Sequence, residues 1–407
     1  MQAHRLVQVC VLVMTIAFAG GLAVQTASAQ TQPDAEWQAR VQTLEEQVKQ
    51  LKAELDALRG QTAAAPQPVA DAGAATTAAA SAAPGSSKIF NPDTSVIGNF
   101  IGVAGRNPTS EQPPLSLTEV EAAFQAVVDP YARADFFLAA SPEGLEVEEG
   151  YITFTSLPAG VLLKVGKMRA QFGKVNTMHT HIVPWADRPL VSQNLLGGEE
   201  GLTDSGFSVS KLIPNDFMFV DLTGEVYRGR SEVFQSKERS KLNYIGRLRG
   251  YRDLTEGTNL DMGVSYARGH SAALEGFNTE LTGVDFTFRY RPLRRAIYRQ
   301  FVGRTEIFWS RHDVPSGLQQ RTSGFYGSAD YQFARRWFIG ARGDRSGRAL
   351  DSDLRDTGGS VHLTFRPTEF GLIRGQYRRT SYAEGVDANE LLFQVNFSIG
   401  AHGAHSF

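Results

Sequence analysis

Two histidines and an aspartate in the 407-residue chain stand at spacings that metal ligands can have. His179 and His181 are two positions apart, and Asp187 follows in the same segment. Imidazole and carboxylate groups bind zinc, but two histidines at this spacing are more typical of a plain loop. The chain also lacks a nucleotide-binding glycine motif, a G-x-S-x-G elbow and an H-E-x-x-H pair. We therefore expect no catalytic residues, no metal and no cofactor.

Composition excludes two broad classes of protein. Residues are 42% hydrophobic and 21% charged, and an apolar run of helix-spanning length occurs only at the N-terminus, which excludes a helical membrane protein. The net charge of −2 argues against nucleic-acid binding. The 40 glycines, 25 phenylalanines and single cysteine suit many short strands made outside the reducing cytosol.

The first 29 residues have the pattern of a secretory signal peptide. A weakly basic start precedes an apolar run over 6–23, and Ala27-Ser28-Ala29 supplies the small residues of a cleavage site. We expect cleavage after Ala29, which would remove Cys10, the only cysteine. The alternative is an uncleaved membrane anchor.

Residues 30–60 have the heptad pattern of a periplasmic coiled coil. The apolar seam consists of Val41, Leu44, Val48, Leu51, Leu55 and Leu58. Such a helix would be about 39 Å long, and its seam would meet copies of itself. Valine at two a positions with leucine at d favours a dimer, and the alternative is a surface helix lying on its own protein. Residues 61–88 are rich in Ala and Pro and predict a flexible linker.

From residue 89 to 407 the chain alternates apolar and polar residues. Val284, Phe286 and Phe288 fall on one face, for example, and Asp285 and Arg289 on the other. Segments of about ten such residues, separated by turns and by no linker, are typical of transmembrane strands. The 319 residues predict an all-β fold, a closed antiparallel barrel of about 16 strands in a bacterial outer membrane. The last strand is expected to end near Ile399, before the terminal Phe407.

Residues 170–205 form the longest strand-poor stretch of the barrel. A loop of this length in a compact barrel is unusual enough to suggest a function. Folded inward, it would narrow the lumen and select solutes, and the alternative is an extracellular cap without that role.

Charged residues are unevenly divided between the two halves of the barrel. Residues 89–225 contain 8 Lys or Arg against 17 Asp or Glu, whereas residues 226–407 contain 27 against 19. Because consecutive strands are neighbours, we expect an acidic wall to face a basic one. Charges at a constriction set ion selectivity. The candidate pore-lining or constriction residues are Lys174, Asp187, Arg188, Glu199, Glu200, Arg247, Arg249, Arg289, Arg304, Arg342, Arg374 and Arg378.

Part of the barrel sequence resembles the phosphate-selective porin O and P family. The resemblance rests on 149–154, Gly160, 166–169 and Phe172-Gly173, and the architecture fits a trimeric outer-membrane porin. It implies trimers, diffusion of small and often anionic solutes, and a constriction lined by Arg and Lys. We predict passive diffusion of small hydrophilic solutes, with lipid, further copies of the chain and peptidoglycan as partners. The alternative is a structural anchor whose coiled coil contacts the cell wall.

Deletion of residues 34–60 tests the coiled coil. We expect the oligomer to weaken, because the heptad seam would no longer join the chains. Sedimentation of the detergent-solubilised protein measures the change, and unchanged assembly would count against this role of the segment.

Overall fold

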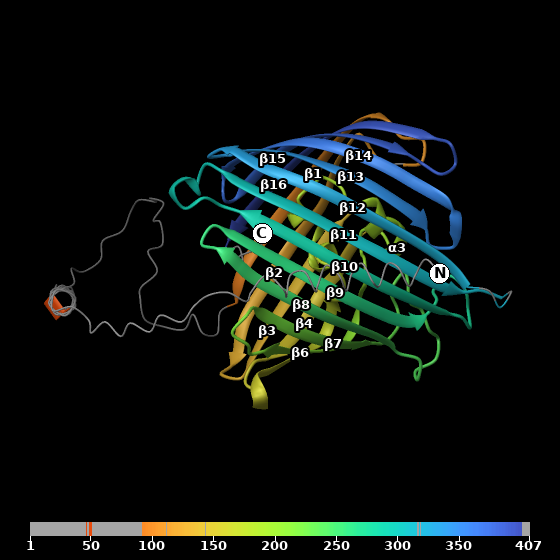
Figure 1. Ribbon diagram of the computed structural model, residues 1–407, viewed down its shortest axis with the longest axis horizontal. Coiled ribbons are helices and arrows are strands. Elements are labelled where there is room, and N and C mark those ends of the chain that lie inside the picture. The colour runs from red at the N-terminus through yellow and green to blue at the C-terminus, as the bar shows by residue number, and fades with distance from the viewer. Residues whose placement is uncertain are drawn as a thin grey trace, which may run out of the picture. The chain divides into compact units, whose positions relative to one another are not determined.

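The computed structural model describes residues 92–400 except 111, 143, 316 and 318, together with Glu46, Lys49 and Gln50. Within 92–400 the chain forms a closed antiparallel barrel of sixteen strands (Figure 1). The strands are β1 (Asp93–Arg106), β2 (Leu115–Asp129), β3 (Ala132–Ser141), β4 (Gly144–Phe154), β5 (Val161–Arg169), β6 (Thr203–Ile213), β7 (Phe219–Tyr227), β8 (Asn243–Thr255), β9 (Thr258–His270), β10 (Asn278–Tyr290), β11 (Gln300–Asp313), β12 (Gln319–Ala334), β13 (Trp337–Arg348), β14 (Asp351–Thr368), β15 (Gly371–Ser381) and β16 (Asp387–Gly400). The predicted fold class and strand number are confirmed.

Each strand pairs with its neighbours in sequence, and β1 pairs with β16 to close the barrel. In that closing pair, Val96 lies opposite Ile399 and Ile101 opposite Gln394. Closure leaves no strand edge with unpaired backbone groups, which is the condition for a sheet to stand in an apolar solvent.

The alternation in the sequence separates an apolar outer face from an inner face. On β16, Leu391 and Phe393 are 56% and 46% exposed, whereas Leu392 and Gln394 between and beside them are buried inside. The outer face is therefore a belt of exposed aliphatic and aromatic side chains. Several aromatic residues of this belt lie at one end of the barrel, beside the turns: Tyr131, Phe217, Tyr290, Phe333, Trp337 and Phe370.

The two ends of the barrel differ in their connections. At the end where β1 begins and β16 ends, most turns are short, as in the β8–β9, β12–β13 and β14–β15 connections. At the other end the β7–β8 connection spans 228–242 and the β5–β6 connection spans 170–202. Short turns at one end and long loops at the other are usual in outer-membrane barrels.

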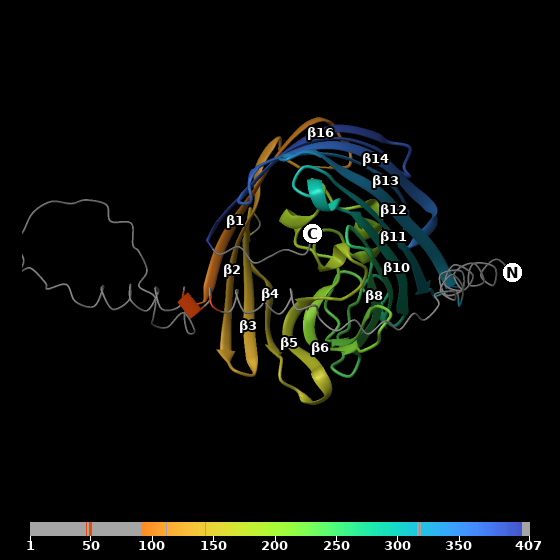
Figure 2. The ribbon, with the colours of Figure 1, turned by 60° about the vertical axis from the view of Figure 1, so that its left-hand side comes forward.

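The β5–β6 connection, which we call the inner segment (residues 170–202), lies inside the barrel. It contains the short helices η2 (Val175–Thr177) and η3 (Thr180–Ile182) and the helix α3 (Leu190–Leu196). Figure 2 shows this yellow-green stretch within the ring of strands. Short 3-10 helices also follow β4 (η1, Pro158–Gly160) and β10 (η4, Leu293–Arg295).

Several predictions concern residues that the structure does not describe. The signal peptide, the linker and the seam of the coiled coil lie outside the described residues, and of the segment 30–60 only Glu46, Lys49 and Gln50 are described, as helix. Strand β16 ends at Gly400, one residue beyond the expected end, and 401–407 are not described. None of the helices in the described part of the chain has the length and apolarity required to cross a membrane.

Replacement of Val361 by arginine tests whether the outer belt faces lipid. Val361 lies near the middle of β14 and is 54% exposed. An arginine near the bilayer midplane costs roughly 2–4 kcal/mol, against about 0–1 kcal/mol near an interface. We expect Val361→Arg to lower the free energy of unfolding in lipid vesicles far more than Leu350→Arg in the β13–β14 turn. Equal losses in the two variants, measured by denaturant titration, would contradict a lipid-facing belt.

Candidate functional site

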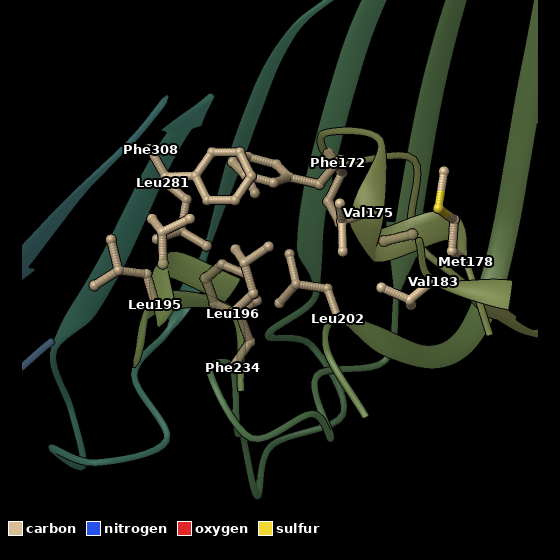
Figure 3. Close-up of a cluster of buried hydrophobic side chains, with 14 of the residues drawn as sticks. Phe172, Val175, Met178, Val183, Leu195, Leu196, Leu202, Phe234, Leu281 and Phe308 are labelled. Atoms are coloured by element: carbon tan, nitrogen blue, oxygen red, sulfur yellow. The ribbon is translucent and has the colours of Figure 1, made fainter. Parts of the chain in front are cut away.

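The inner segment is attached to an apolar patch on the inner wall. Phe172, Leu195 and Leu196 of the segment pack against Leu281 and Phe308 of β10 and β11 (Figure 3). The rings of Phe172 and Phe308 are 5.3 Å apart between centroids. Each fully buried Leu or Phe contributes about 1.5–3 kcal/mol, so this cluster supplies much of the energy that holds the segment inside.

Gly173 allows the segment to enter the lumen close to this patch. Its φ of 62° lies in the left-handed region, and a Cβ there would stand 2.8 Å from the ring of Phe308. Glycine alone tolerates both conditions without strain. The carboxylate of Glu306 next accepts hydrogen bonds from the backbone N–H groups of Lys174 and Val175.

From this point the segment crosses the lumen to β2 and β4. His179 donates hydrogen bonds to Glu121 of β2 through Nδ1 and to Glu149 of β4 through Nε2. Burial alone would lower the pKa of His179, but the hydrogen bonds to these carboxylates raise it to about 10. The imidazole is therefore protonated at neutral pH and forms a charged link between segment and wall.

The segment then follows the opposite wall back toward β11. Asn396 of β16 donates a hydrogen bond to the carbonyl of His181, at 2.7 Å, and Arg374 of β15 donates one to that of Val183, at 3.4 Å. The backbone N–H of Leu190 donates to Asp344 of β13, at 3.2 Å, where α3 begins. The inner segment thus touches most of the circumference of the barrel.

Asp187 makes an ionic attachment to two strands at once. It lies 2.8 Å from Arg342 of β13 and 3.0 Å from Arg378 of β15, and the side-chain amide of Gln376 donates to it as well. Burial would raise the pKa of Asp187, but Arg342 and Arg378 lower it to about 2. Trp185 packs beside this group, with the guanidinium of Arg342 4.8 Å from its ring centroid.

The crossing leaves a cavity of about 570 Å³ along one side of the lumen. Its acidic lining comes from Glu121 and Glu149, and its basic lining comes from Lys174, Arg247, Arg249 and Arg289. The lining therefore contains charges of both signs, and Lys174 comes from the half of the barrel sequence that is acidic overall. This cavity is the candidate functional site.

The basic residues of the cavity differ in how they are paired. Arg247 pairs with Asp285 at 2.9 Å, and Lys174 and Arg249 share Asp261. Arg289 forms no ion pair with any described residue, although it lines the cavity. It is the lining cation whose charge is least compensated by a bonded carboxylate.

The structure divides the predicted pore residues into three groups. The cavity is lined by Lys174, Arg247, Arg249 and Arg289. The segment is held in place by Asp187, Arg342, Arg374 and Arg378, and Arg188 stabilises it from within, donating to the carbonyls of Val175 and Met178. Outside both groups, Arg304 pairs with Asp330 at 2.7 Å, and Glu199 and Glu200 are exposed near the end of the segment.

Two details of the sequence interpretation need correction. The segment ends at residue 202, because Thr203–Ser205 already belong to β6. Asp187 lies with arginines and not with the two histidines, since the chain turns between 181 and 187 toward a different wall. Sequence reasoning also missed Glu306 and Glu149 as attachment points for the segment. Both are strand residues at positions whose side chains point into the lumen, which was the available signal.

Comparison with known proteins places the chain in a family and a fold. No family model matches the sequence. An uncharacterized protein of Aquifex aeolicus (strain VF5) is 30% identical over 392 residues, covering 80% of this chain and 81% of that protein. The chain belongs to the family of that protein.

Solved structures with the same fold include two channels. The anion-selective porin from Comamonas acidovorans matches with a TM-score of 0.54 and 8% identity, over 76% of this chain and 100% of that one. The outer membrane channel DcaP of Acinetobacter baumannii matches with a TM-score of 0.53 and 8% identity, over 76% and 96%. At these identities the likeness shows the porin-type barrel fold alone.

Acidification and substitution of Asp187 test its ionic attachment. The pKa of Asp187 is lower in the folded protein than in the unfolded chain, where it is about 3.8. Ionised Asp187 therefore stabilises the fold fully at pH values above about 3.8, and this contribution is lost as the pH falls toward about 2. We expect the emission of Trp185, measured in a variant that keeps it as the only tryptophan, to shift to the red over this range. Asp187→Asn should show the shift already at pH 7.

The matched control for this test is Asp353→Asn, in an exposed part of β14. It should behave as the parent does. Asp187→Asn with parental emission at pH 7 would contradict a holding role for Asp187.

Proposed function

We propose that this protein is an outer-membrane porin for passive diffusion of small hydrophilic solutes. The observation that carries the proposal is the charged cavity beside the inner segment, inside a closed barrel whose outer face is apolar. A barrel with this outer face is stable in lipid, and a polar lumen with an inward loop passes solutes by size and charge. Nothing in this arrangement calls for a chemical step, so the proposal is a channel and not an enzyme.

The orientation follows from the two ends of the barrel. In outer-membrane barrels the short turns face the periplasm and the long loops face outward. The end where β1 begins would therefore face the periplasm, and residues 30–60 and the linker 61–88 would lie there too. The aromatic residues beside the short turns would then stand at the periplasmic interface of the membrane.

The lining favours anions over cations. Four basic side chains face the cavity against Glu121 and Glu149, and Arg289 is free to attract a passing anion. Arg247, Arg249 and Lys174 already neutralise carboxylates, so they contribute less field to the passage. The name of the Comamonas acidovorans relative in fold, an anion-selective porin, agrees with this preference. Specificity for phosphate among anions is a narrower proposal, which is supported by the resemblance of residues 149–173 to the phosphate-selective porin O and P family.

The same proposal includes a trimer. OmpT of Vibrio cholerae, described in a trimer form, has the same fold with a TM-score of 0.51. The apolar outer face of the barrel can meet lipid or another barrel, and the coiled coil of residues 30–60 would bring the chains together. Peptidoglycan would be reached from this periplasmic segment.

Conductance measurements test the channel and its selectivity together. We expect stepwise conductance in planar bilayers and a reversal potential in a KCl gradient that indicates chloride preference. Arg289→Gln should lower that preference, because it removes the unpaired lining charge. Arg336→Gln, an equal change in the exposed β12–β13 turn, is the control and should leave the preference unchanged.

The outcomes separate the parts of the proposal. Absence of conductance from correctly folded protein would overturn the channel and favour the structural anchor. Cation preference in the parent, or equal effects of Arg289→Gln and Arg336→Gln, would overturn the assigned selectivity.

A further inference from the structure

A cluster of histidine and glutamate side chains lies where the inner segment meets β2 and β4. His179 and His181 come from the segment, Glu119 and Glu121 from β2, and Glu148 from β4. His179, His181, Glu121 and Glu148 are each at most 7% exposed. Imidazole nitrogens and carboxylate oxygens, the atoms that bind transition metals, are therefore concentrated at this point of the lumen wall.

We propose that Glu121, His179 and His181 bind a divalent transition-metal ion of the zinc class, with Glu119 or Glu148 completing the site. One ligand atom from each of the first three residues lies within 4.8 Å of the others, and the same holds for Glu119, Glu121 and Glu148. Two imidazoles with carboxylates are a zinc-type set, since Mg²⁺ and Ca²⁺ prefer oxygen ligands alone.

Several separations within the cluster are close to those of ligands around one ion, whereas His179 Nδ1 and Glu121 Oε2 are closer, because they are hydrogen-bonded to each other. His181 Nδ1 lies 3.6 Å from Glu119 Oε1 and 3.7 Å from Glu121 Oε2, and His179 Nδ1 lies 3.4 Å from Glu148 Oε2. Zinc–ligand lengths of about 2.0–2.2 Å place tetrahedral ligands roughly 3.3–3.6 Å apart. An ion could enter the cluster once His179 Nδ1 loses its proton and separates from Glu121 Oε2, and a small movement of the other side chains would then bring them to bonding distance.

The outer contacts of the cluster are those of a metal centre. His179 Nε2 donates its hydrogen to Glu149, which fixes the ring so that Nδ1 faces the cluster. A metal-bound histidine usually donates its second N–H to a carboxylate in this way. Glu148 is held from outside the cluster by Arg169 through its other oxygen, Oε1.

Two buried carboxylate oxygens of the cluster accept no hydrogen bond from any residue that the structure describes. They are Glu119 Oε1 and Glu148 Oε2, both inaccessible to solvent. A buried carboxylate oxygen without a donor is costly, and coordination of a cation would remove that cost. Counting Glu149, four carboxylates lie near Arg169 and the two imidazoles. The cluster therefore carries excess negative charge, which a dication would neutralise.

Occupation of the site would change the passage next to it. Glu121, Glu149 and His179 line the 570 Å³ cavity as well as the cluster. A bound dication would replace the proton on His179 Nδ1, releasing it to solvent, and would make the acidic side of the cavity more positive. This effect on permeation rests on the proposed channel, whereas metal binding itself does not.

The test uses the full-length folded protein, stripped with EDTA and titrated with ZnCl₂ at pH 7.5. We expect calorimetry to show about one Zn²⁺ per chain, with Mg²⁺ binding far more weakly. His181→Ala and Glu121→Gln should weaken Zn²⁺ binding by at least the roughly 10–100-fold that loss of an outer-shell partner costs. His362→Ala, which changes another buried lumen histidine beside Asp330, is the matched control and should bind as the parent does.

Folding of each variant is followed by heat-modifiable migration on gels. If either His181→Ala or Glu121→Gln fails to fold, the binding measured for the other variant tests the site. No Zn²⁺ binding by the parent, equal affinity for Mg²⁺, or unchanged binding in both cluster variants would overturn the site. Conductance with and without ZnCl₂ is a separate measurement. Binding without a change in conductance would remove the effect on permeation and leave the site, and a protein that binds Zn²⁺ but conducts nothing would overturn only the channel.

Discussion

The apolar patch on the inner wall is the feature on which the arrangement of the lumen depends. The segment of 33 residues packs inside the barrel against a dry surface, which Ile245, Leu281, Phe308 and Tyr326 provide. Burial of these side chains supplies several kcal/mol at about 1.5–3 kcal/mol each. A buried ion pair, in contrast, often gains little over its cost of desolvation. The hydrophobic contacts therefore hold the inner segment inside, and the ionic contacts determine its position.

This division of roles changes how the lumen arginines are to be understood. Arg342 and Arg378 hold Asp187, and Arg374 binds a backbone carbonyl of the segment. Their charge is used in holding the segment, so a count of inward arginines overstates the positive field in the passage. Selectivity then depends on a few cavity residues whose charge remains uncompensated, of which Arg289 is the clearest.

The sequence was sufficient for the fold because every strand repeats the same rule. Alternation of apolar and polar residues predicts which side chains face outward, and the length predicts the strand number. The rule fails where inward positions are apolar. Phe308 is two residues from Glu306 and points into the lumen as Glu306 does, but it belongs to the run Ile307-Phe308-Trp309, in which three apolar residues are adjacent. Such a run marks a strand that is apolar on both faces, and it is the signal that could have located the patch.

Partners across the lumen could not be predicted in this way. Strand parity predicts that Glu121 and Arg342 point inward, but their partners belong to a segment without regular periodicity. Which wall His179 or Asp187 reaches depends on the path of the inner segment, and that path depends on the apolar patch and on Gly173. The metal hypothesis at His179 and His181 grouped them with Asp187 for this reason, because proximity in sequence was the only guide available.

The part of the inner segment that crosses the lumen, from its contact with Glu306 to His179, connects the ion selectivity of the passage to its width. Its first end is held by a carboxylate that accepts two backbone N–H groups, and its far end is a protonated imidazole between Glu121 and Glu149. In an open lumen, a change of one charge alters only the field that a solute meets. Here the carboxylates that border the cavity also hold the segment that bounds it, so loss of one charge changes the field and releases part of the boundary. Breaking such a buried pair costs about 3–5 kcal/mol, which is enough to move the crossing and therefore to alter the size of the passage as well as its preference.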